Sequence, residues 1–364
     1  MRIALIAPLV TPIREPQRGG SQSAVADLAA GLQARGHTVH VYAATGSEIP
    51  GVTMIDTGID AASLAGTFFR AASPGRSDDL TAEGAFSTVY AAVRDVPYHI
   101  VHNHAFDAPA IRLAVGLAVP VVHTLHLPPN VSVLAALEDV GRSERPPAVA
   151  AVSAFQAGAW RSLTRVDQVL PNGVPTARIP WSASRGFGMV FAGRLSPEKG
   201  AAEAIEIARR AGEHIDLYGD PYDLEYAQRK VYPRASEPGV AVHAAVDRAV
   251  LWEIMSRASV VLCPSMWDEP FGMVAAEAQA GGTPVVGFRR GGLQEVVADG
   301  VTGFLVTPDD IAAAAAAIRN AATSISRSAC RHRAQTCLDL ESSLDAHEEL
   351  YGRMTRSVKA RIDA

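Results

Sequence analysis

Short hydrophobic runs alternate along the chain with longer segments in which hydrophobic residues recur every three or four positions. The short runs are rich in valine, isoleucine and leucine, which is typical of buried strands, whereas the longer segments have the period of amphipathic helices. Between residues 21 and 35, for example, Val25, Leu28 and Leu32 fall on one helical face. This β–α alternation predicts parallel sheets that are covered by helices on both faces.

The alternation runs through the chain twice. In the first half we expect a helix at 21–35 and strands at 2–8, 38–43, 99–102, 119–124 and 148–152, with Ser153 as the N-cap of a following helix. In the second half we expect helices at 201–211, 250–257, 273–280 and 309–321 and strands at 188–192, 214–218, 240–243, 259–263, 284–288 and 304–306. Turn-forming residues at 171–175 separate the halves. The pattern predicts an α/β protein of two Rossmann-like parallel-sheet domains facing a cleft, residues 1–175 and 176–343, with a last helix at about 344–364 packing back on the first domain.

Composition and charge narrow the class of protein. The 364 residues, 48% of them hydrophobic, can build two full cores. Basic and acidic residues nearly balance, with 12 against 14 up to residue 175 and 21 against 24 beyond it, so neither half is basic. We therefore expect no nucleic-acid partner and no attraction to an anionic membrane surface.

Cysteine usage and hydrophobicity predict the compartment. Cys263, Cys330 and Cys337 form no CxxC pair, which favours a reducing environment. The opening run MRIALIAPLV lacks a small-residue cleavage site and predicts a first strand, not a signal peptide. No hydrophobic stretch approaches the ~20 residues that cross a bilayer. The sequence predicts a soluble, cytoplasmic protein.

Several familiar signatures are missing from the sequence. No GxGxxG follows the first strand, and GxxxxGK[ST], HExxH, GxSxG and Asp-x-Asp do not occur. Phosphate chemistry would therefore depend on cationic side chains and backbone amides. The histidines at 102, 104, 123 and 126 could indicate zinc, but no cysteine accompanies them and strand alternation turns His123 away. We expect no bound metal and no cofactor.

The segment SMWDEPFGMVAAE, residues 265–277, has the strongest chemical pattern. Glu269 lies in a loop after a predicted strand, and Glu277 follows eight positions later on the next helix. The amides of Gly272, Met273 and Val274 begin that helix and form an anion site at its positive end. Taken alone, either glutamate could be an ordinary helix charge, but this helix is too hydrophobic to be mostly exposed.

A second segment, GRLSPEKG at residues 193–200, follows the first predicted strand of the second half. Arg194 and Lys199 lie on its turn and could hold phosphate oxygens, the arginine through a planar fork and the lysine as a compact charge. A surface turn with solvated charges is the alternative. The glutamate segment in the same domain favours a phosphate clamp.

Together these segments resemble the retaining glycosyltransferase family 4, which has the GT-B fold. The resemblance is carried by FAGRLSPEKG at 191–200, PNGV at 171–174, the run from 264 to 297, and Gly19-Gly20 followed by a helix and GHTV at 36–39. It covers nearly the whole chain, and its most specific parts are the Glu-x7-Glu spacing and the GRLSPEKG segment.

The resemblance implies roles for matching residues. Arg194 and Lys199 would hold the donor diphosphate, Glu277 the ribose hydroxyls, and Glu269 the hydroxyls of the transferred sugar. His126 would be an active-site histidine near that sugar. Further donor contacts would come from Gly20, Phe271, Gly272, Met273, Val274, Gly219 and Asp220, and a second group of candidates is Gly19, Asn103, His104 and Asn172. The first domain would bind the acceptor and the second the nucleotide sugar.

The nucleobase pocket departs from the family pattern. Pro221 stands where a second glycine is common, and Ala244-Ala245 stand where a glycine is frequent. The resemblance thus implies a retaining transfer of a hexose from a nucleotide-diphosphate sugar, with UDP favoured, to a small soluble acceptor. The donor sugar, the acceptor and the oligomeric state stay open.

Other functions remain as alternatives. A phosphorylase, a transferase to nitrogen or sulfur, and a lipid or polysaccharide acceptor are compatible with the same fold. The adjacent Phe68 and Phe69 could make a hydrophobic contact with a membrane. A silent nucleotide-sugar binding module would not need all of Arg194, Lys199, Glu269 and Glu277.

Overall fold

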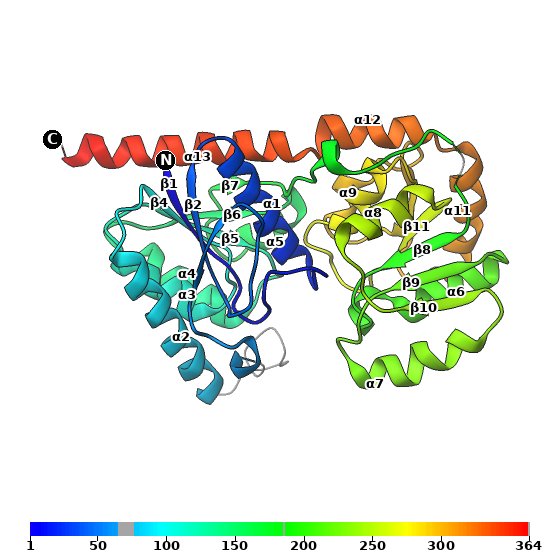
Figure 1. Ribbon diagram of the computed structural model, residues 1–364, viewed down its shortest axis with the longest axis horizontal. Coiled ribbons are helices and arrows are strands. Elements are labelled where there is room, and N and C mark those ends of the chain that lie inside the picture. Colours follow the sequence, from blue (N-terminus) through cyan, green and yellow to red (C-terminus); the bar gives the residue numbers. More distant parts are fainter. Residues whose placement is uncertain (65–75, 185, 363–364) are drawn as a thin grey trace. The chain divides into compact units, whose positions relative to one another are not determined.

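The computed structural model describes residues 1–64, 76–184 and 186–362 and divides into two α/β units (Figure 1). The first unit comprises Met1–Arg14, Ser21–Pro171 and Leu340–Ala364, and the second comprises Glu15–Gly20 and Asn172–Asp339. The predicted boundary at residue 175 had placed 15–20 and 172–175 in the first domain. Phe68 and Phe69 lie outside the described residues.

The first unit is built on a sheet of seven parallel strands in the order β3-β2-β1-β4-β5-β6-β7. Its strands are β1 (Arg2–Ile6), β2 (Thr38–Ala43), β3 (Thr53–Asp56), β4 (Ile100–Asn103), β5 (Val121–Leu125), β6 (Ala148–Ala151) and β7 (Gln168–Val169). Its α-helices are α1 (Gly20–Ala34), α2 (Arg76–Arg94), α3 (Ala108–Arg112), α4 (Val131–Gly141), α5 (Ala154–Arg161) and α13 (Leu340–Ile362).

Alternating strand residues divide the core of the first unit between the two faces of the sheet. Ile3 and Leu5 of β1 pack with α1 and α13, and Val25, Leu28 and Leu32 of α1 are buried there as the sequence predicted. Ala4 and Ile6 pack on the opposite face, against α2 and α3. The last helix is also held to this unit by charge, because Arg35 forms ion pairs with three of its carboxylates, Glu341, Asp345 and Glu348.

The second unit has a sheet of six parallel strands in the order β10-β9-β8-β11-β12-β13. Its strands are β8 (Met189–Ala192), β9 (Ile215–Tyr218), β10 (Val240–His243), β11 (Val260–Cys263), β12 (Val285–Phe288) and β13 (Gly303–Val306). Its helices are α6 (Ala201–Ala211), α7 (Leu224–Tyr226), α8 (Arg248–Arg257), α9 (Met273–Ala280), α10 (Leu293–Val296), α11 (Ile311–Ser324) and α12 (Arg327–Cys337).

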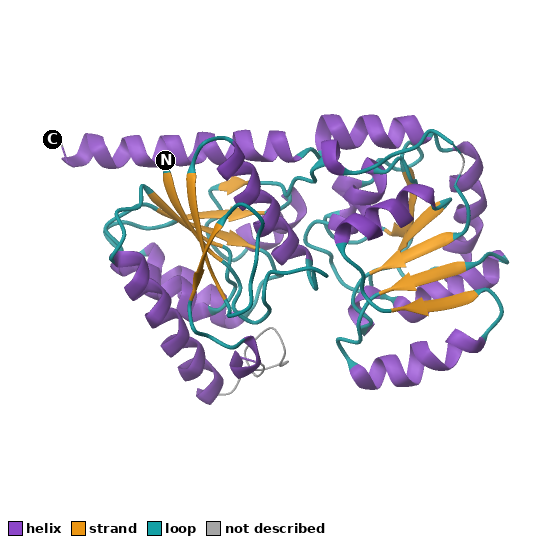
Figure 2. Ribbon diagram, in the orientation of Figure 1, coloured by secondary structure: helices purple, strands orange, loops and turns teal. Residues whose placement is uncertain are grey.

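In both units the strands form a central layer between helices (Figure 2). In the second unit α6 and α11 build the main core against the sheet, while α8 and α12 pack against α9. The predicted α/β class with two parallel sheets is confirmed. Ligands of such sheets bind beyond the carboxyl ends of the strands, so the loops after β8, β9 and β11 are the segments of interest.

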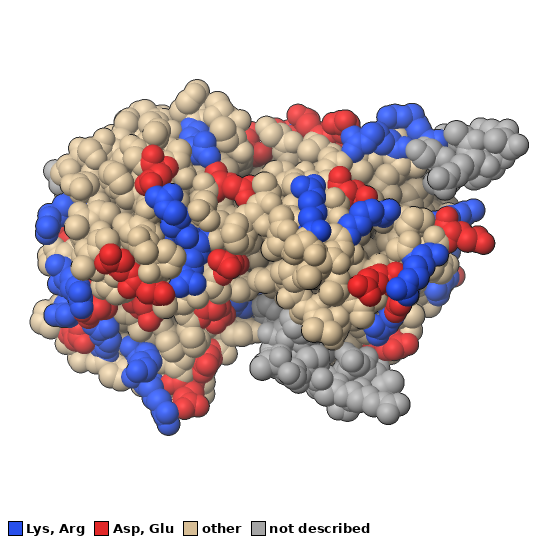
Figure 3. Space-filling model, turned by 180° about the vertical axis from the view of Figure 1, so that it is seen from behind, with Lys and Arg blue, Asp and Glu red and all other residues tan. Residues whose placement is uncertain are grey.

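The structure also corrects the sequence-based element assignment. The Ser153 cap is confirmed, since its hydroxyl accepts a hydrogen bond from the amide of Gln156. Strand β3 and helices α2, α4 and α12 were not predicted, although Phe86, Val89, Tyr90 and Val93 of α2 stand at helical spacing and are buried. Among the described residues no helix is long and hydrophobic enough to span a membrane. On the face shown in Figure 3, basic and acidic side chains are interspersed.

Candidate active site

An ion pair between Lys199 and Glu269 lies at the carboxyl edge of the second sheet. Lys199 ends a short 3₁₀ turn after β8, and Glu269 lies in the loop after β11, the strand beside β8. The Lys199 ammonium donates to both carboxylate oxygens of Glu269, at 2.7 and 2.8 Å. Two predicted site residues that are 70 positions apart in the sequence are thus in direct contact.

The loop after β11 holds Glu269 in place. The Ser265 hydroxyl and the Trp267 indole N–H both donate to its Oε2, at 3.1 and 3.0 Å, and Gly292 N–H donates to its backbone carbonyl at 2.7 Å. Burial alone would raise the pKa of the Glu269 carboxyl, but the Lys199 charge and these hydrogen bonds lower it below its ordinary value. Glu269 is therefore a fixed, ionised carboxylate.

Arg194 lies on the same turn as Lys199 and is mostly buried. Its guanidinium donates to Glu198 at 3.1 Å and lies over the Tyr222 ring, 4.4 Å from the ring centroid. Arginine over an aromatic ring keeps its planar donors aligned at little entropic cost. Ser265, Trp267 and Tyr222 were not predicted as site residues, although Ser265 and Trp267 stand within the segment 265–277 that the sequence singled out.

The start of α9 has the geometry of an anion site. Gly272 precedes the helix with φ of +108°, a conformation that side chains with a Cβ rarely adopt. Phe271 and Met273 on either side are buried, and Val274 is half-buried. The backbone N–H groups in the first turn of α9 have no acceptor within the helix. They project from its N-terminus, which is the positive end of the helix dipole. Gly20 lies beside this turn, since a Cβ placed on it would be 3.3 Å from Met273 Cγ.

Glu277 is buried on the second turn of α9, with a relative exposure of 4%. Arg248, the first residue of α8, donates to Glu277 Oε1 from Nε at 3.2 Å and from Nη2 at 2.8 Å. The structure therefore places Glu277 in an ion pair of its own, separate from the Lys199–Glu269 pair. Arg248 was missed because only the packing of α8 on α9 brings the two residues together.

The turn after β9 contains the other predicted donor contacts. Gly219 is packed so closely that a Cβ there would lie 1.8 Å from the Gly193 carbonyl oxygen, so this turn needs glycine. Asp220 accepts from the Ala245 amide at 3.1 Å, and its other oxygen is 3.8 Å from Arg18. Gly219 thus brings the turn after β9 against the turn that carries Arg194.

Of the remaining candidates, Asn103, His104 and His126 belong to the first unit, and Gly19 and Asn172 belong to the second. Nδ1 of His104 and Nε2 of His126 are 3.0 Å apart, and both rings are buried. The Asn103 side chain donates to the Ala105 carbonyl at 3.0 Å and accepts from the Ala105 amide at 3.1 Å, and its Nδ2 lies 3.1 Å from His123 Nδ1. Asn172 opens the second unit, and Gly19 lies in the 15–20 segment that groups with it.

His104 and His126 belong to a larger cluster of buried histidines. Burial lowers the pKa of its five members, His102, His104, His123, His126 and His347, to about 4 for the last two. Neighbouring histidines lower it further for His102, His104 and His126. The His102 ring lies 4.0 Å from that of His104 and hydrogen-bonds to Thr124 and to Tyr351 of α13. Within the described residues no group of His, Cys, Asp or Glu is arranged to hold a metal ion.

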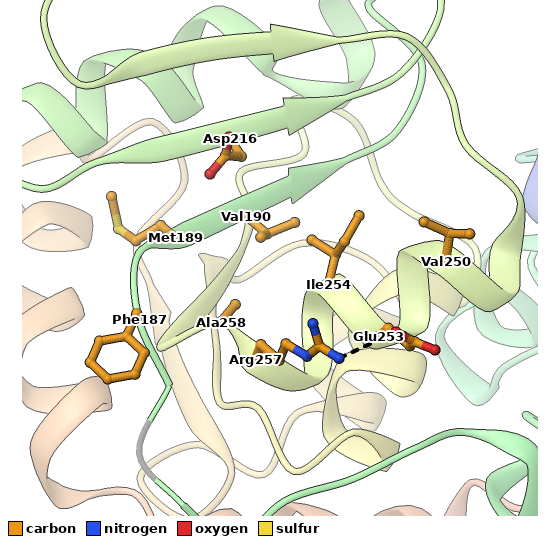
Figure 4. A pocket seen from close by; sticks show the side chains of 9 residues that line it. All are labelled: Phe187, Met189, Val190, Asp216, Val250, Glu253, Ile254, Arg257 and Ala258. Atoms are coloured by element: carbon orange, nitrogen blue, oxygen red, sulfur yellow. Dashed lines mark hydrogen bonds and ion pairs between the residues drawn. The ribbon is translucent and has the colours of Figure 1, made fainter.

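A hollow of about 410 Å³ lies elsewhere in the second unit, between the sheet and α8 (Figure 4). Val190 and Asp216 face it from the strands, and Ile254 and Glu253 from the helix. It contains none of the predicted site residues, so the candidate site is defined by the contacts at the carboxyl edge.

Two family models match the chain. The model of Glycosyltransferase Family 4 matches residues 18–178, and that of Glycosyl transferases group 1 matches residues 183–336. Among curated proteins, the D-inositol 3-phosphate glycosyltransferase of Acidothermus cellulolyticus is 30% identical over 373 residues, covering 87% of this chain and 82% of that protein. The glycogen synthase of Mycobacterium tuberculosis is 31% identical over 197 residues, and the match spans about half of each protein, 50% of this chain and 47% of the synthase.

Solved structures share the fold over nearly the whole chain. Sucrose-phosphate synthase from Thermosynechococcus elongatus superposes with a TM-score of 0.79 at 21% identity, covering 98% of this chain and 99% of that one. Anabaena Alr3699/HepE in complex with UDP-glucose has a TM-score of 0.71 at 20% identity, covering 97% of this chain and 100% of that one. At such identities the likeness concerns the fold alone.

Proposed function

Because the chain belongs to the glycosyltransferases with the GT-B fold, we propose that it transfers a hexose from a nucleotide-diphosphate sugar to a small, water-soluble acceptor, with retention at the anomeric carbon. The observation that carries this proposal is the cluster of Lys199, Glu269 and the start of α9 at one sheet edge. UDP is the favoured nucleotide, supported by the neighbour that binds UDP-glucose.

The cluster suits the departure of a diphosphate. As the bond from the anomeric carbon to the phosphate oxygen breaks, its electron pair stays on the phosphate, where Arg194, Lys199 and the α9 amides would meet the growing charge. Fixed cations and dipoles of this kind stabilise a transition state without needing to reorganise. Phosphate binding at Lys199 would compete with its present contact to Glu269 and release that carboxylate toward the sugar hydroxyls.

The transfer itself needs no protein nucleophile in this proposal. The acceptor hydroxyl attacks the anomeric carbon from the side of the leaving group, and its proton passes to the departing phosphate oxygen. His126, held neutral by burial, would serve as a hydrogen-bonding partner of the donor sugar rather than as a charged group. The relatives aligned over most of their length are named for D-inositol 3-phosphate, so an inositol monophosphate is the first acceptor to test.

A nucleotide-release assay tests the proposed reaction. We expect UDP to be released from UDP-glucose faster with an acceptor present than without one, and NMR of the product to show the anomeric configuration of the donor. Release that requires inorganic phosphate and yields a sugar 1-phosphate would indicate a phosphorylase instead. If the protein binds nucleotide sugars but releases no nucleotide with any donor and acceptor tried, it would be a nucleotide-sugar binding module without transferase activity.

Activity is also expected to persist in excess EDTA. The proposed phosphate site holds two cationic side chains and a helix start, and the sequence has no Asp-x-Asp to carry a metal-bound diphosphate. Initial rates measured before and after chelation, with added Mg²⁺ or Mn²⁺ as the control, give the answer. Loss of activity in EDTA that either metal restores would contradict a metal-independent mechanism.

A further inference from the structure

Arg248 occupies a position that is costly for a cation. It is the first residue of α8, where the helix dipole disfavours positive charge, and its side chain is only 9% exposed. A buried arginine is tolerated only where anionic or hydrogen-bonding partners compensate its lost hydration. The groups that compensate the charge of Arg248 therefore indicate its role.

Contacts of its side chain and of its backbone hold Arg248 in place. Its guanidinium makes two hydrogen bonds to Glu277 Oε1 and lies over the Trp252 ring, 4.8 Å from the centroid. Its backbone N–H donates to the Glu15 carboxylate at 2.9 Å, which supplies an acceptor at the start of α8 where Asp247 makes no side-chain cap. Trp252 lies one helical turn further along, on the same face of α8.

These contacts determine the orientation of Glu277. A carboxylate on a helix retains freedom about its last torsion, and that torsion is broad for glutamate. Two donors from one rigid guanidinium on a single oxygen remove most of that freedom before any ligand arrives. We propose that Arg248 is a positioning residue for the donor nucleoside: it holds the Glu277 carboxylate in the orientation that accepts the ribose hydroxyls. This inference rests on the ribose role of Glu277 within the proposed function.

The geometry requires arginine and not only a positive charge. A lysine at this position could bring one ammonium to Glu277 but would lack the planar fork and the stacking on Trp252. Preorganisation of this kind raises affinity by lowering the entropy lost on binding. The effect should therefore appear in the recognition of ribose hydroxyls, and not in contacts with the base or the phosphates.

Calorimetric titration of nucleotides with and without the 2′-hydroxyl isolates this contribution. UDP and 2′-deoxy-UDP are titrated first, and ADP and GDP with their 2′-deoxy forms follow if UDP does not bind. Wild-type protein should bind the ribonucleotide roughly tenfold more tightly, the ratio expected when a hydrogen bond to a charged group is lost. In Arg248→Lys and Arg248→Met this ratio should fall to within about twofold, through weaker binding of the ribonucleotide while binding of the 2′-deoxy form persists.

Two controls separate positioning from general damage. Arg257→Gln removes an arginine from the exposed side of the same helix and should keep the wild-type ratio. Glu277→Gln should by itself bring the two affinities, for the ribonucleotide and for its 2′-deoxy form, to nearly the same value. Adding Arg248→Met to Glu277→Gln should not change them further. Arg248→Met alone leaves the Glu277 carboxylate buried without this arginine and could therefore fold poorly, whereas the double variant has no carboxylate there and keeps the test possible.

The outcomes distinguish this proposal from the proposed function. Arg248 variants that keep the wild-type ratio, or that lose both nucleotides equally, would overturn the positioning role. A wild-type protein that binds both forms equally would overturn it together with the ribose role of Glu277. A wild-type ratio that depends on Arg248, in a protein that transfers no sugar, would support positioning and contradict only the transferase activity.

Discussion

Replacing Lys199 by alanine should reduce kcat/KM by roughly two to four orders of magnitude, the usual consequence of removing a charge that stabilises a transition state. The ammonium would contact the leaving diphosphate, and it also donates to both carboxylate oxygens of Glu269. Arg194→Ala should act in the same direction. Steady-state rates of UDP release at varied donor concentration measure the effect.

Folding is expected to survive the Lys199 substitution. The lysine lies on a short turn, and Glu269 would keep its hydrogen bonds from Ser265 and Trp267. Lys230→Ala, at an exposed lysine of the same unit, is the matched control and should have the wild-type kcat/KM. Near-wild-type turnover in Lys199→Ala, at an unchanged unfolding temperature, would remove Lys199 from the phosphate site.

The contact between Lys199 and Glu269 shows which features of the site can be predicted from the sequence and which cannot. Both residues were predicted as site residues because each follows a buried strand and precedes a helix start. That they touch depends on β11 lying beside β8 in the sheet, although β9 and β10 intervene in the chain. Strand order is a property of tertiary packing that hydrophobic periodicity does not encode, so the pairing had to come from the structure.

Arg248 illustrates a second kind of gap. Its spacing from Trp252 predicts a shared helical face, but the partner on that face is a glutamate of another helix, 29 positions away. A buried ion pair between two helices leaves no signature in either one. The same holds for Tyr351 and His347, which join the histidines of β4 and β5 only because α13 packs on the first sheet.

The described histidine cluster should make the stability of the first unit strongly dependent on pH. Burial is the main cause that lowers the pKa of each of its five members, which are His102, His104, His123, His126 and His347. In the unfolded chain each returns to its ordinary pKa of about 6.5, so below that pH the unfolded state binds more protons than the folded state. Stability is therefore fully present above about pH 6.5 and is lost as the pH falls.

The expected loss is large. Between pH 7.5 and 5.5 each histidine with a strongly lowered pKa contributes about 1.4 kcal/mol, so five together contribute about 7 kcal/mol, comparable with the whole stability of a small domain. Native-state hydrogen exchange, read separately in peptides from the two units, measures it. The second unit is the internal control, because its histidines, His214, His243 and His332, do not belong to the cluster.

Single substitutions show whether the cluster is the cause. His347→Gln removes one buried histidine, and the first unit should then lose about 1.4 kcal/mol less than wild type between pH 7.5 and 5.5. His332→Gln removes an exposed histidine of the second unit and should leave the pH dependence unchanged. If the first unit in the wild-type protein is as stable at pH 5.5 as at 7.5, the buried rings must gain a compensating partner on protonation, and the neutral cluster described here would not be the form present in acid.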